Sequence, residues 1–114
     1  MSTCFDYSTY LDIPKAILNK DYATEKGIVV RHFKHYGLYI IKYMKTQLCE
    51  DNIITLGKFR SVITDGEKIL SSSPGKSCNF LKFIEDTNSE DCDIENFFEG
   101  TMINLFYHNN NWEL

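Results

Sequence analysis

The chain has 114 residues, of which 43% are hydrophobic and 14% aromatic, and this is enough to build the core of one domain. Its longest apolar run is far too short to cross a bilayer, and its first residues lack both the basic start and the apolar run of a leader peptide. We therefore expect no membrane association and a cytoplasmic location. The net charge of −4 is uneven, because residues 85–95 hold six carboxylates and no base whereas residues 26–49 hold five bases and no acid. The acidic segment is typical of a solvated loop, and the basic segment fits either a phosphate-facing surface or an ordinary solvated strand edge.

The cysteines and histidines give no metal-binding pattern. His32 and His35 could meet on one face of a helix, but two ligands without a third or fourth make a poor metal site. No cysteine pair has the CxxC spacing, so we expect free thiols at Cys4, Cys49, Cys78 and Cys92. We predict no metal site.

The first half of the chain predicts a short helix followed by two strands. Asp12 is a candidate N-cap and Pro14 suits the first turn of a helix over residues 13–21. Residues 27–33 and 37–44 are rich in β-branched and aromatic side chains and are separated by a break at Gly37.

Alternation in the second of these strands puts three large side chains on one side. They are Tyr39, Ile41 and Tyr43. Such a row describes either an ordinary core face or a surface on which bases of single-stranded RNA stack.

The second half predicts a β-hairpin, a loop, a helix and a final pair of strands. Asp65-Gly66 supplies the tight turn of a hairpin within residues 56–73, in which Phe59, Ser61 and Ile63 alternate with Arg60, Val62 and Thr64. A loop follows, and then a helix over residues 78–86 with Phe80, Leu81, Phe83 and Ile84 facing inward. Residues 101–114 read as a strand, a polar turn and the beginning of another strand. The predicted class is α+β, with a mainly antiparallel sheet and a few short helices.

Three blocks in this order resemble the front part of an RNA-ligase-type nucleotidyltransferase domain, and the chain is similar in style to degenerate relatives in large DNA viruses. "FRSVITDGEKILSSSPGKSCNF" resembles the upstream pattern of an arginine, a hairpin and a lysine-bearing loop. "FFEGTMINLFY" resembles the nucleotidyl-lysine motif Lys-x-Asp-Gly-Ser with its hydrophobic strand, and "NNNWEL" looks like the start of the next strand. The resemblance implies a partial nucleotidyltransferase-like region over residues 38–114, preceded by an N-terminal helix and strand over residues 1–37 of one single domain.

In this alignment Glu99, Gly100 and Thr101 match the Asp-Gly-Ser of the motif, and the position of the nucleophilic lysine falls on Phe97. A phenylalanine cannot attack phosphorus, so the usual lysyl-nucleotide intermediate is not expected. ATP and Mg²⁺ would be needed only by an active form, in which Lys42 or Lys76 would have to replace the missing amine within about 3–3.5 Å of the phosphate.

The resemblance also assigns nucleotide or RNA contacts to Arg60 and Lys76, because a guanidinium and an ammonium both hold phosphate oxygens. Lys42, on the basic stretch, is a further candidate. Each has an ordinary alternative, since an exposed loop lysine is usually just solvated and the glycine of Glu99-Gly100-Thr101 can mark a strand entrance.

Three hypotheses follow from these residues. The chain is a catalytically degenerate RNA-ligase-like protein that binds RNA or a nucleotide or has a structural role. Alternatively, it is the N-terminal part of a split or longer ATP-dependent RNA ligase. In the third hypothesis it is a protein-interaction module that binds a partner or a second copy through an open sheet edge.

Overall fold

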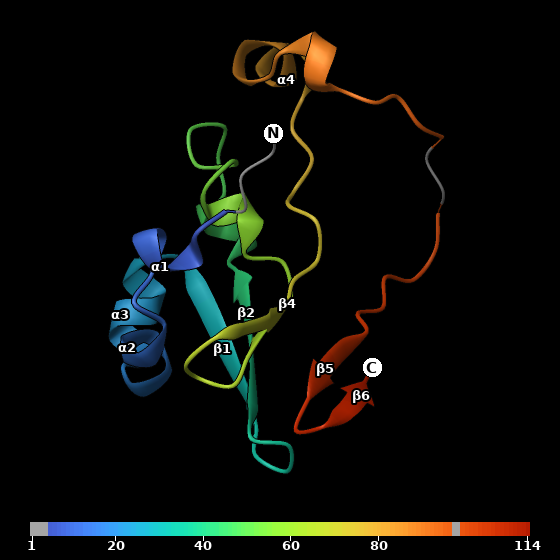
Figure 1. Ribbon diagram of the computed structural model, residues 1–114. Coiled ribbons are helices and arrows are strands. Elements are labelled where there is room, and N and C mark those ends of the chain that lie inside the picture. The colour runs from blue at the N-terminus through green and yellow to red at the C-terminus, as the bar shows by residue number, and fades with distance from the viewer. Residues whose placement is uncertain (1–4, 97–98) are drawn as a thin grey trace.

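The chain forms an α+β fold with a four-stranded antiparallel sheet and a few short helices, as seen in a computed structural model (Figure 1). The structure describes residues 5–96 and 99–114. The α+β class predicted from the sequence is therefore confirmed. This class is shared by many unrelated proteins, so it does not test the resemblance to nucleotidyltransferases.

The N-terminal segment folds into three short helices, each started by a side-chain cap. The helices are α1 (Tyr7–Tyr10), α2 (Ile13–Leu18) and α3 (Lys20–Glu25). Asp12 caps α2 by accepting a hydrogen bond from the Lys15 amide, as the sequence predicts. The single helix expected over residues 13–21 is instead two, because Asn19 has an extended backbone that ends α2, while its side chain accepts from the Tyr22 amide and starts α3.

The sheet consists of two sequential hairpins joined side by side. Its strands, in the spatial order β1-β2-β3-β4, are β1 (Ile28–Phe33), β2 (Leu38–Tyr43), β3 (Val62–Thr64) and β4 (Ile69–Ser71). The β1–β2 pairing runs from Ile28 opposite Tyr43 to Phe33 opposite Leu38. The hairpin expected at Asp65-Gly66 is confirmed, and the two strands expected on either side of Gly37 also pair as a hairpin. The buried Thr64 hydroxyl braces the second turn, donating to the Lys68 carbonyl at 2.6 Å.

The three helices cover one face of the sheet and form the main core with it. Strand residues such as Ile28, Ile41 and Val62 are at most 1% exposed there, and they pack in one cluster with Leu11 and Ala16 of the helical segment. Ile41 thus belongs to a core face, which is one of the two interpretations of its strand, the other being a surface for stacking RNA bases.

Phe59 closes the same core beside the last residue of β2, Tyr43. It is 0% exposed, and its ring lies 5.1 Å from that of Tyr7 and 5.4 Å from that of Tyr10, with Phe5 beside them. The regular alternation expected from Phe59 through Thr64 is wrong. Phe59 follows a 3₁₀ turn, η2 (Leu56–Lys58), and Ser61 has a φ of 50°, so the strand begins only at Val62.

A third hairpin lies against the opposite face of the four-stranded sheet. It is formed by β5 (Phe106–His108) and β6 (Asn111–Glu113), which pair only with each other. Phe106 is 6% exposed and packs with Leu38 and Ile63 of the four-stranded sheet in a smaller core cluster. The expected strand, turn and strand are present, but β5 begins at Phe106 rather than at Thr101.

The helix expected over residues 78–86 forms as α4 (Phe80–Asp86), with Asn79 as its N-cap. Its predicted burial is wrong. The four apolar side chains expected to face inward are exposed by 43% or more: Phe80, Leu81, Phe83 and Ile84. In Figure 1 the chain carries α4 away from the four-stranded sheet. Two further 3₁₀ turns, η1 (Lys45–Gln47) and η3 (Ser89–Asp91), lie in the connecting segments.

Candidate nucleotide and RNA site

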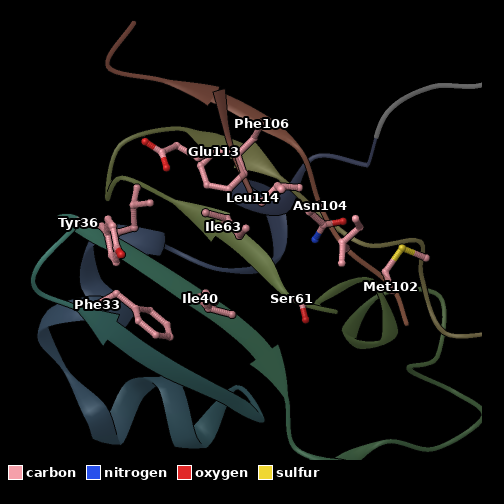
Figure 2. A pocket seen from close by; sticks show the side chains of 12 residues that line it. Phe33, Tyr36, Ile40, Ser61, Ile63, Met102, Asn104, Phe106, Glu113 and Leu114 are labelled. Carbon is pink, nitrogen blue, oxygen red and sulfur yellow. The ribbon is translucent and has the colours of Figure 1, made fainter. Parts of the chain in front are cut away.

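An open groove separates the four-stranded sheet from the C-terminal hairpin and the segment before it. It has a volume of 560 Å³ and is lined mainly by apolar side chains. Figure 2 shows Phe33, Ile40 and Ile63 on the sheet side, with Phe106 and Met102 across from them. We call this space the sheet groove. Its size is in the range of small-molecule sites, which run from about 300 to 1,000 Å³.

Few polar groups line the sheet groove, and one of them is held in place. The Asn104 side chain donates from Nδ2 to the Oγ of the buried Ser73 at 3.3 Å. Tyr36, Ser61 and Glu113 supply the remaining polar side chains of the lining. The groove therefore offers a few polar contacts within apolar walls, an arrangement typical of small-molecule sites.

Beside the sheet groove, the segment from Gly57 to Arg60 runs along the loop that precedes α4. The Lys76 amide donates to the Gly57 carbonyl at 2.9 Å, and the Ser73 amide donates to the Arg60 carbonyl at 3.0 Å. This pairing brings Arg60 and Lys76, which are 16 positions apart in the sequence, into one neighbourhood. The loop predicted between residues 71 and 77 is thus fastened to the sheet by backbone hydrogen bonds.

The Arg60 guanidinium already has protein partners. Its Nη1 donates to the Pro74 carbonyl at 3.1 Å and to that of Gly75 at 3.4 Å. One face of the guanidinium thus holds the loop, and because Arg60 is exposed, its other N–H groups remain accessible to an anion.

Lys42 joins this neighbourhood from β2. Ile41 pairs with Val62, and the Tyr43 amide donates to the Phe59 carbonyl at 2.8 Å, so Lys42 lies alongside the irregular Arg60-Ser61 step. Alternation puts the Lys42 side chain on the same side of the sheet as Ile40, which lines the sheet groove. Three of the six residues matched to nucleotide or RNA contacts therefore lie close together along the backbone.

Lys58 is a fourth cation that the sequence reading missed. Its side chain passes over Gly75, where an added Cβ would lie 3.0 Å from Lys58 Cδ and 3.5 Å from Nζ. A signal for it existed in the sequence, because Lys58 precedes Arg60 by two positions in the segment expected to be extended. We refer to Lys42, Lys58, Arg60 and Lys76 as the cationic strip.

The other matched residues stand apart from the cationic strip. Glu99, Gly100 and Thr101 are all exposed, and an added Cβ at Gly100 would meet nothing within 4 Å. In residues 5–96 and 99–114, no hydrogen bond joins these three to Arg60 or Lys76. They do not stand directly before a strand, as the sequence suggested, because β5 starts five positions after Thr101. Phe97, the position expected for the lysine, lies outside the described residues.

Among the described residues, two ionisable groups have shifted pKa values, and neither belongs to the cationic strip. Burial raises the pKa of Tyr10, whose hydroxyl donates to the Lys26 carbonyl at 3.1 Å. Burial alone would raise the pKa of Asp65, but amide hydrogen bonds from Lys68 and Glu67 and the charges of Lys68 and His108 together lower it. The second case shows that His108 of β5 lies near the β3–β4 turn.

Within the described part of the chain, no three His, Cys, Asp or Glu side chains are grouped so as to hold a metal ion. No helix among these residues is long and apolar enough to span a bilayer. Comparison of the chain with family models, curated proteins and solved structures found no match.

Proposed function

We propose that the chain binds single-stranded RNA or a nucleotide in the cytoplasm without attaching the nucleotide to itself, as expected of a degenerate relative of RNA-ligase-type domains. One observation carries the proposal: the cationic strip brings together the backbones of three separate segments, and Ser61, which follows Arg60, lines an open apolar groove of nucleoside size. Phosphate needs cations, and a base needs a flat apolar surface, so the two features together suit a nucleotide better than either does alone.

The sheet groove contains exposed aromatic rings that suit base stacking. Phe33 is 37% exposed and Tyr36 is 60% exposed, and both line the groove (Figure 2). Stacking of a base on an aromatic side chain contributes about 1–3 kcal/mol and tolerates any sequence. We infer that a base enters against Phe33 and Tyr36 while Lys42, four positions from Leu38 along β2 at about 3.3 Å per residue, approaches a phosphate further along the strand.

The absence of self-nucleotidylation rests on the sequence register. The nucleophile in this family is a lysine amine, and the residue that aligns with it is Phe97. Lys42 and Lys76 belong to other segments, so in this proposal they bind phosphate oxygens rather than attack phosphorus. ATP and Mg²⁺ are then possible ligands but not obligatory cofactors.

The binding part of the proposal is tested by fluorescence anisotropy with a labelled single-stranded RNA over a series of salt concentrations. Each phosphate neutralised contributes about 0.7 to the slope of log K against log salt concentration for a single strand. Lys42→Ala is expected to weaken binding and to reduce that slope by about this amount. Lys20→Ala, an exposed lysine on α3 at the helical side of the sheet, is the matched control and is expected to leave both unchanged.

Equal effects of Lys42→Ala and Lys20→Ala would contradict the assignment of phosphate to the cationic strip. The catalytic part is tested separately by the intact mass of the protein before and after incubation with ATP or GTP and magnesium, alongside a ligase that does label. We expect no change of mass. A gain of one nucleoside monophosphate would refute the loss of the nucleophile.

A further inference from the structure

The exposed apolar surface of α4 lacks a binding role in the proposed function. Phe80 is 74% exposed, Leu81 73% and Ile84 53%, within a helix of only seven residues. Isolated helices of this length are marginal in water, and most helical stability comes from packing an apolar face. Exposed apolar residues gathered on one short element mark an interaction surface rather than scattered surface variation.

The charge next to α4 selects the kind of partner. Residues 85–95, which begin in the last turn of α4, carry six carboxylates and no base. Such a segment is repelled by nucleic acid and by anionic lipid surfaces. Two copies of α4 would also repel each other if they paired face to face. The apolar side chains of α4 and the acidic segment beside it therefore fit an apolar protein surface that is bordered by positive charge.

The sheet groove of this chain is a surface of that kind. Its walls include Phe33, Leu38 and Ile63. Arg31 lies next to it, exposed and on the same side of β1 as Phe33. The stretch that supplies this strand, residues 26–49, has five bases and no acid. Glu113 is the charged side chain of the lining and lies on the wall formed by the C-terminal hairpin, so the acidic segment beside α4 is expected to meet the Arg31 side of the groove, where apolar contact and opposite charge combine.

α4 does not occupy the sheet groove of its own molecule. In Figure 1, α4 lies at the end of the molecule remote from the β5–β6 hairpin, which forms one wall of the sheet groove. We propose that α4 of one chain docks in the sheet groove of a second copy, and that the second copy returns the same contact, giving a two-fold symmetric dimer. A reciprocal exchange of this kind closes the assembly at two copies.

The dimer does not depend on RNA, but one consequence of it rests on the proposed function. If a base and α4 use the same groove, RNA and the second copy compete for it. Binding of RNA would then convert dimers into monomers, and dimerisation would lower the apparent affinity for RNA.

Sedimentation equilibrium over a range of micromolar protein concentrations tests the dimer without RNA. The wild-type chain is expected to dimerise, and more weakly at high salt because part of the attraction is electrostatic. The double variant Phe80→Ser/Phe83→Ser removes two apolar side chains of α4 and is expected to raise the dimer dissociation constant by at least about tenfold. Leu18→Ser on α2, a residue that is 87% exposed, is the matched control and is expected to leave it unchanged.

A mixing experiment distinguishes the proposed contact from other dimers and from misfolding. Phe33→Ser alters the groove but keeps α4, whereas the α4 double variant keeps the groove. Each alone is expected to be monomeric, and their mixture is expected to form heterodimers through the one intact α4–groove contact.

A wild-type chain that stays monomeric throughout would overturn the proposal. A dimer that survives either variant, or variants that do not complement on mixing, would also overturn it. RNA binding is measured by anisotropy on its own, so a failure of the RNA proposal leaves the dimer result intact, and the reverse also holds.

Discussion

Replacing Phe59 with alanine probes the core on the helical side of the sheet. The ring is 0% exposed and meets the rings of Tyr7, Tyr10 and Phe5 with centroid separations of 5.1, 5.4 and 6.3 Å. The substitution removes a fully buried ring and leaves a cavity that the surrounding side chains fill only in part. Such changes cost about 3–5 kcal/mol. A domain of this size has a total stability of about 5–15 kcal/mol, so the loss is a large share of it.

Urea unfolding followed by far-ultraviolet circular dichroism measures this loss. Phe80→Ala is the matched control, since it removes the same side chain from a site that is 74% exposed, and it is expected to change stability by at most about 0.5 kcal/mol. Low protein concentration keeps the comparison on monomers. A loss below about 1 kcal/mol for Phe59→Ala, or similar losses for the two variants, would show that Phe59 does not close the core as described.

Two further predictions concern the turns of the sheet. The lowered pKa of Asp65 means that its charged form stabilises the fold above the ordinary carboxyl pKa of about 4, and that this contribution is lost as the pH falls through the folded-state pKa. Asp65→Asn should therefore destabilise the chain at neutral pH and approach wild type in strong acid, and a pH-independent difference in urea midpoints would contradict this. Gly27 and Gly37 have φ values of +77° and +65°, but an added Cβ meets Gln47 and Leu56 at 3.2 Å only at Gly27. Gly27→Ala is thus expected to cost at least about 1 kcal/mol more than Gly37→Ala in thermal or urea unfolding, and equal costs would refute the close approach.

Local signals along the chain were sufficient for the elements that depend on turns and caps. Asp65-Gly66 marked the β3–β4 hairpin, Gly37 marked the break between β1 and β2, and Asp12 marked the start of α2. These features rest on the backbone preferences of neighbouring residues, so they are readable before any tertiary contact is known. The same reasoning missed the break at Asn19, because one side chain serves there as the end of one helix and the cap of the next.

Part of the candidate site could also be anticipated. Arg60, Lys76 and Lys42 were chosen on the resemblance and on charge, and the structure brings their backbones together through pairings between segments far apart in the chain. Lys58 was missed because its place over Gly75 depends on how the loop folds back. No pattern in the sequence predicted the sheet groove, because its walls come from separate segments: the end of β1 and the turn after it, β2 and β3, and the C-terminal segment.

Local periodicity, turn residues and composition were enough to predict the α+β class, a mainly antiparallel sheet, the hairpin at Asp65-Gly66 and the separation of basic from acidic segments. Which apolar residues are buried depended on tertiary contacts. Phe80 and Phe59 are the same residue type, yet one is 74% exposed and the other 0%. Burial depends on which distant segment meets a side chain, and a local pattern does not specify that encounter.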